Sequence, residues 1–151
     1  MMSFMKLIHL LAITVWVGGM FFAYVVLRPS AAEILQPPER LRLWDKTFSK
    51  FFNWVWLGIF LILVSGFYMI YLFGGFVHLP MYINLMMLMG IVMVAIFVYV
   101  FFKCYALFTR QVANQDWKAA GAMLGTIRKL VGLNLTIGLL TVVVATVGIY
   151  L

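Results

Sequence analysis

The chain alternates long apolar runs with shorter polar stretches, and this pattern predicts its architecture. Apolar residues dominate the four ranges 4–28, 51–73, 81–107 and 130–151. A helix of about 20 apolar residues spans the hydrocarbon core of a bilayer, and none of the runs shows the period-two alternation of a strand. We therefore predict an all-α fold, a transmembrane bundle of four helices that forms one domain over residues 1–151.

Proline and glycine residues set the predicted ends of these helices. Pro29 is expected to end the first helix, because proline disfavours helical angles in the residue before it. Residues 29–49 are expected to form a polar connector, with a short interfacial helix that starts at Pro37. The glycine pair at 74 and 75 is expected to end the second membrane helix, and residues 109–128 to form a second polar connector.

Composition and charge place the chain in a membrane and orient it there. The sequence is 66% hydrophobic and 10% charged, unlike a soluble globular protein. Of the eleven lysines and arginines, all but Lys6 lie in the two polar connectors or in the helix ends beside them. By the positive-inside rule the connectors face the cytoplasm, so we expect a multi-pass protein of a bacterial inner (cytoplasmic) membrane with both termini on the periplasmic side. Topology and anionic lipid account for the net charge of +7, and no nucleic-acid partner is expected.

Apart from Lys6 near its start and Arg28 at its end, His9 is the one residue of the first apolar run that can carry a positive charge near neutral pH. Such a residue in a membrane helix is costly and is a functional-site candidate by default. On a helix, His9 shares one side with Met5, Trp16 and Met20. Neutral imidazole is the commonest metal ligand. The alternatives are a hydrogen bond to a neighbouring helix, pH sensing and contact with a substrate.

Imidazole and thioether side chains gather at the predicted outer end of the bundle. The candidate metal ligands are His9, His78, Met5, Met81 and Met86. These groups suit copper, and thioethers select Cu(I), so copper is the first candidate. The set can meet only if the first and third helices are neighbours. Alternatively, the methionines fill apolar space and His78 is a solvated turn residue.

Haem b is the second candidate cofactor. His9 would be an axial ligand, Trp16 a wall of the pocket and Gly19 a gap for the macrocycle. Asn84, a polar residue near the start of the third run, completes the candidate cofactor-binding residues. No second histidine lies inside another apolar run, so ligation would need His78, a methionine, an open position or a partner subunit.

Catalytic motifs are missing from the sequence. It has no P-loop, GxSxG or HExxH pattern, and its four acidic residues all lie in the connectors. We predict no catalytic residue, and an enzyme with this sequence would be a haem-dependent oxidoreductase. In a third interpretation the chain is a structural or assembly subunit of a respiratory complex. The expected partners are membrane lipid, a second copy in a homodimer packed through strips of small residues, and a periplasmic copper or redox partner.

Several segments resemble the copper-resistance D (CopD) family. IHLLAITVWVGGMFFAYVVLRP resembles the opening helix of that family through His9, Trp16, Gly18-Gly19 and Arg28-Pro29. Gly66 resembles a glycine of its second helix, and RKLVGLNLTIGLLTVVVATVG resembles its last helix. The resemblance implies a membrane protein that moves or handles copper.

A weaker similarity links the chain to the HemJ-type protoporphyrinogen oxidases. These proteins share the Lys-x-x-His opening, present here as Lys6 to His9. Their third helix opens with a lysine, whereas this chain reads MYINLMM with Asn84. The departure argues against the oxidase activity and leaves haem binding open.

Overall fold

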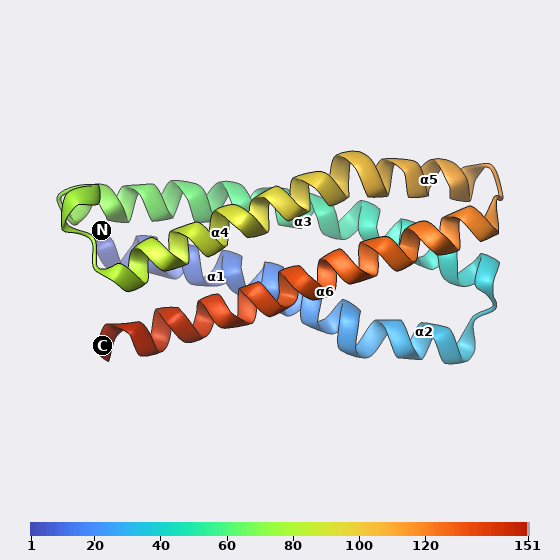
Figure 1. Ribbon diagram of the computed structural model, residues 1–151, viewed down its shortest axis with the longest axis horizontal. Helices are drawn as coiled ribbons and strands as arrows, with labels where there is room; N and C mark the ends of the chain where they lie inside the picture. The colour runs from blue at the N-terminus through green and yellow to red at the C-terminus, as the bar shows by residue number, and fades with distance from the viewer. Residues whose placement is uncertain (151) are drawn as a thin grey trace.

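The structure, a computed structural model, describes residues 1–150, and it does not describe the side chain of His78. Its elements are helical, and those labelled η are π-helical or 3-10 turns (Figure 1). In chain order they are α1 (Met2–Phe21), η1 (Phe22–Leu27), α2 (Arg28–Ile34), α3 (Pro37–Leu72), η2 (Phe76–His78), α4 (Met81–Tyr99), η3 (Val100–Tyr105), α5 (Ala106–Ala113), α6 (Trp117–Val147) and η4 (Gly148–Tyr150).

These elements join into long helices that can cross a membrane. Within residues 1–150, four spans qualify by length and apolar composition: Met2–Ile34, Pro37–Leu72, Met81–Ala113 and Trp117–Tyr150. At 1.5 Å per residue each is about 50 Å long, which exceeds the roughly 30 Å of a hydrocarbon core. The predicted four-helix membrane architecture is confirmed, and the helix ends must extend beyond the acyl chains. Both termini lie at the same end of the bundle (Figure 1).

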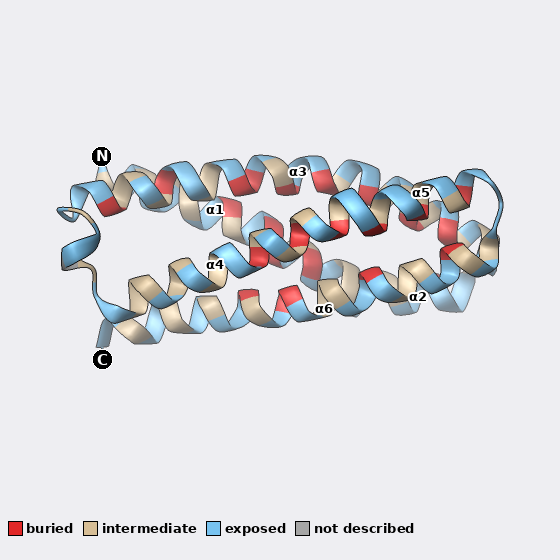
Figure 2. Ribbon diagram, turned by 45° about the horizontal axis from the view of Figure 1, so that its top comes forward, coloured by how far each residue is buried: buried red, intermediate tan, exposed pale blue. Residues whose placement is uncertain are grey.

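The helices pack as two main pairs around an aromatic core. α1 packs mainly on α3, and α4 packs mainly on α6. Phe97 of α4 fills the middle, with edge-on contacts to Trp16 at 6.2 Å and Phe52 at 5.4 Å between ring centroids. The buried residues occupy the faces that the helices turn towards one another (Figure 2). The outward faces carry large exposed apolar side chains, as the lipid-facing surface of a membrane bundle does.

Two predicted helix boundaries at the first connector are wrong. Pro29 does not end the first helix, which continues to Ile34. The π-helical turn η1 directly precedes α2. The regular α-helical hydrogen bonds are therefore already interrupted just before Pro29, which has no N–H to donate, and the helix continues past the proline. The short interfacial helix at Pro37 is also wrong as a separate element, because the helix that starts there runs on without a break to Leu72.

The second connector is likewise shorter than predicted. The third span continues to Ala113, and α6 begins at Trp117, so only three residues separate the two helices. Asp116 caps α6 by accepting a hydrogen bond from the backbone N–H of Ala119 at 3.1 Å. By contrast, the glycine pair ends α3 as predicted: Gly74 and Gly75 both have φ of +90°, which favours glycine.

Candidate functional site

The clearest polar contact inside the membrane-spanning region joins α1 to α3. His9 Nδ1 lies 2.9 Å from Ser65 Oγ. Ser65 is 1% exposed, whereas His9 is half-buried. Each residue lies seven positions from the same end of the bundle, His9 after Met2 and Ser65 before Leu72. The pair therefore sits at a matched depth, about 10 Å inside the helix ends.

The hydrogen bonds of Ser65 indicate which nitrogen of His9 carries the proton. The Ser65 hydroxyl lies 2.6 Å from the Leu61 carbonyl oxygen and 3.2 Å from that of Ile62, both of which can only accept. A hydroxyl has one proton to donate, and the short contact assigns that proton to the backbone. Ser65 Oγ must then accept from His9, so Nδ1 carries the hydrogen. The lone pair of the neutral ring is left on Nε2, which is then the ring atom free to bind a metal.

Gly66 completes the contact surface for the imidazole. A Cβ built at Gly66 would lie 3.5 Å from His9 Cε1 and 3.9 Å from His9 Nδ1. The ring therefore rests on the one position of this turn that has no side chain. Ser65 and Gly66 together hold the ring in position, Ser65 by a hydrogen bond and Gly66 by close packing.

The other predicted metal ligands are distributed over the same end of the bundle. Met5 is half-buried one turn outward from His9 on α1. Met81 is 83% exposed, and Met86 is half-buried on α4, which packs mainly on α6 rather than on α1. His78 belongs to η2 at this end, but its side chain lies outside what the structure describes. Among the described side chains, no three His, Cys, Asp or Glu residues come together as a metal site.

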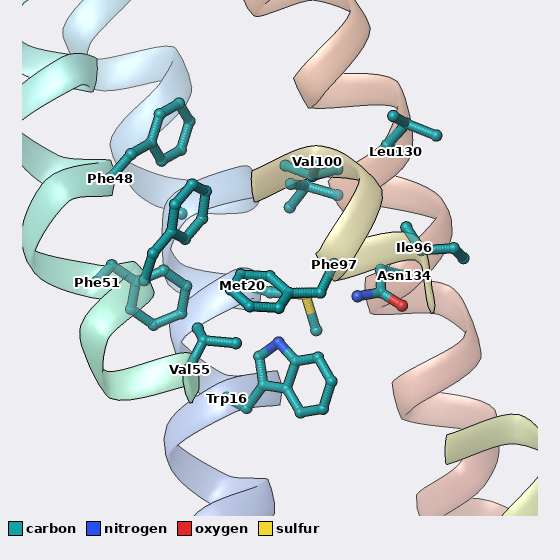
Figure 3. A pocket seen from close by; sticks show the side chains of 13 residues that line it. Trp16, Met20, Phe48, Phe51, Val55, Ile96, Phe97, Val100, Leu130 and Asn134 are labelled. Atoms are coloured by element: carbon teal, nitrogen blue, oxygen red, sulfur yellow. The ribbon is translucent and has the colours of Figure 1, made fainter. Parts of the chain in front are cut away.

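The remaining predicted cofactor residues take part in packing. Trp16 lines a small cavity at the centre of the bundle, where Met20, Phe97 and Asn134 also converge (Figure 3). Gly19 lies against the ring of Phe51, which a Cβ at this position would displace. Asn84 donates from Nδ2 to the Leu79 carbonyl oxygen at 3.4 Å, which ties the start of α4 to its loop.

The central cavity is too small for a porphyrin. Its volume is about 30 Å³, whereas pockets for ligands of drug size measure about 300–1,000 Å³. Asn134 Oδ1 is buried there and has no hydrogen-bond partner among the residues that the structure describes, and the space is enough for one water molecule. Of the residues predicted to bind haem, only Trp16 lines this cavity.

Ser65 is the residue of this contact that the sequence interpretation did not identify as part of a candidate site. A serine in an apolar helix usually bonds its own backbone, as Ser65 also does. The signal that could have identified it is the matched depth of His9 and Ser65 in consecutive antiparallel helices.

Comparison with known proteins places the chain in a family. A model of the family described as copper resistance protein D (CopD) matches residues 45–148, which includes Ser65 and Gly66 but not His9. No curated protein and no solved structure matches the chain. The family match covers more than two thirds of the sequence, from α3 to the end of α6. The chain therefore belongs to the CopD family of copper resistance membrane proteins.

Proposed function

We propose that this protein binds Cu(I) at the outer end of its bundle, through Nε2 of His9, as a step in copper handling across a bacterial inner membrane. The contact between His9 and Ser65 carries the proposal. Histidines that bind metals almost always donate their second ring N–H to a neighbouring acceptor, which fixes the tautomer and the ring orientation. Ser65 supplies that acceptor from a buried position on another helix.

Met5 and His78 are the ligands that we propose to join His9. The thioether of Met5 is about one helical turn from His9, towards the outer end. His78 lies in the loop at the same end. A site of imidazole and thioether groups carries no negative charge, which favours the monovalent, soft Cu(I) ion over hard divalent cations. The one-sided distribution of basic residues supports a periplasmic position for this end.

The test measures Cu(I) bound per chain in purified protein, by competition with a chromophoric Cu(I) chelator. Wild type is compared with His9→Ala, His78→Ala and the control Thr14→Ala. Thr14 lies on the same helix and only donates to the Leu10 carbonyl oxygen at 2.8 Å. We expect His9→Ala to lose bound copper, His78→Ala to bind more weakly, and Thr14→Ala to match wild type.

Two results would contradict the proposal. One is an unchanged copper stoichiometry in folded His9→Ala. The other is an intense Soret absorption band in wild type that His9→Ala abolishes, because that result would make His9 a haem ligand.

A further inference from the structure

A second and much larger cavity opens at the opposite, basic end of the bundle. Its volume is about 390 Å³. It lies between the first span, the start of α3 and the first half of α6. Small residues on its walls leave room for the cavity. These small residues are Ala23, Ala32, Gly121 and Gly125.

Three arginines from three different segments line this cavity. They are Arg28 of α2, Arg40 of α3 and Arg128 of α6. No aspartate or glutamate is among the lining residues. Arg28 is held over the ring of Tyr24, with its guanidinium carbon 5.3 Å from the ring centroid. The cavity therefore concentrates positive charge without a carboxylate of its own to balance it.

The depth of the cavity matches the level of lipid headgroups. Arg28 lies 26 residues after the start of α1, about 39 Å along a span of about 50 Å, and thus at the edge of a hydrocarbon core of roughly 30 Å centred on that span. Trp44, Trp117 and Tyr24 also line the cavity, and these amphipathic rings are typical of the headgroup level. The site is separate from His9, which lies 19 residues away on the first span, or about 28 Å.

The inner wall of the cavity is apolar. Leu41 and Ile127 are both buried there. Ala23, Phe48 and Val131 line both this cavity and the small central one, so the basic mouth leads towards the hydrophobic interior. A ligand that fits this arrangement has an anionic group at one end and an apolar body at the other.

We propose that the cavity binds the phosphate of an anionic phospholipid, with Arg28, Arg40 and Arg128 around the headgroup and the apolar wall along the upper acyl chains. Arginine forms paired hydrogen bonds to phosphate oxygens, and basic pockets between membrane helices on the cytoplasmic side bind such headgroups. Inorganic phosphate offers the same charge, but it has nothing to place against Leu41, Ile127 and Phe48. The proposal does not depend on the copper site.

Native mass spectrometry of the detergent-purified full chain tests this proposal. Dioleoylphosphatidylglycerol, dioleoylphosphatidylcholine and inorganic phosphate are titrated separately, and the retained adducts are counted. We expect one phosphatidylglycerol to be retained per chain at concentrations at which phosphatidylcholine and phosphate are not. Each arginine near an anionic headgroup contributes about a fivefold gain in affinity. The triple variant Arg28→Gln/Arg40→Gln/Arg128→Gln should therefore bind about a hundredfold more weakly.

The matched control is the triple variant Lys46→Gln/Lys50→Gln/Lys118→Gln. It removes the same charge from the same end of the bundle, from exposed residues that do not line the cavity. We expect this control to keep its tight phosphatidylglycerol. Equal losses in the two variants would overturn the proposal, because binding would then reflect net charge alone. Equal retention of inorganic phosphate and lipid by wild type would overturn the choice of a lipid. Thermal unfolding of both variants checks that each is folded.

Discussion

Replacing Ser65 with alanine tests whether this hydroxyl prepares His9 for metal binding. The change removes the acceptor 2.9 Å from His9 Nδ1 and little else, because alanine fits the buried position. The Leu61 carbonyl keeps its backbone hydrogen bond within α3. The only group left without its side-chain partner is the Nδ1–H of His9, so the variant isolates one interaction.

The structure predicts two effects of different size. Hydrogen bonds between membrane helices contribute about 0.6 kcal/mol on average and up to about 1.7 kcal/mol, so Ser65→Ala should lower the free energy of unfolding by no more than about 2 kcal/mol. Loss of an orienting partner typically lowers metal affinity about 10- to 100-fold. We therefore expect a folded protein with a clearly weakened Cu(I) affinity.

The assay has two parts. A double-mutant cycle that combines Ser65→Ala with His9→Ala is read by unfolding in mixed micelles, and Cu(I) competition compares Ser65→Ala with wild type. Thr141→Val is the control, because Thr141 is half-buried on α6 and donates only to the Ile137 carbonyl oxygen at 2.8 Å. Ser65 and His9 should be coupled in stability, and Thr141 and His9 should not. Unchanged copper affinity in Ser65→Ala, or an equal loss in Thr141→Val, would refute the reasoning.

Three further predictions concern packing and orientation. Gly138→Ala should lower the free energy of unfolding by about 1–3 kcal/mol, because the added Cβ would lie 3.0 Å from Val17 and 3.1 Å from Met93. The control Gly90→Ala should not lower it, because nothing lies within 4 Å of a Cβ at that position. Ile127→Ala should lower the free energy of unfolding by about 2–5 kcal/mol, because Ile127 is fully buried. Leu133→Ala, on the outer face of the same helix, should lower it far less, and equal losses would contradict the packing. The variant Lys6→Cys should react with an impermeant thiol reagent in intact spheroplasts, and the native Cys104 should add little background because it is buried. Labelling that occurs only after lysis would contradict the proposed orientation.

The four spans could be predicted because long apolar runs directly encode membrane helices. The boundaries near Pro37 could not, because the repeat of Leu41, Trp44 and Phe48 is the same for a helix on the headgroups and for one packed in a core. The structure packs Phe48 against Phe108 of α5, with ring centroids 6.1 Å apart. Such a partner, 60 residues further along the chain, leaves no mark on the local pattern.

The site was predictable only in part for a related reason. His9 was identifiable because an ionisable residue in an apolar run is rare. Its partner depends on which helices are neighbours: α1 packs mainly on α3, which brings Ser65 to His9, whereas Met86 lies on α4, which packs mainly on α6. The three arginines of the basic cavity come from separate segments, and only the fold joins them.

The central claim, that His9 binds Cu(I) through Nε2 while Ser65 holds Nδ1–H, can be tested directly by nitrogen NMR. The protein is labelled with ¹⁵N-histidine, and since the chain has two histidines, the His78→Ala variant assigns the signals of His9. We predict that His9 in the metal-free protein is protonated at Nδ1, and that Cu(I) shifts the Nε2 resonance while Nδ1 keeps its proton. A proton on Nε2, or an Nε2 resonance that Cu(I) leaves unchanged, would contradict the account.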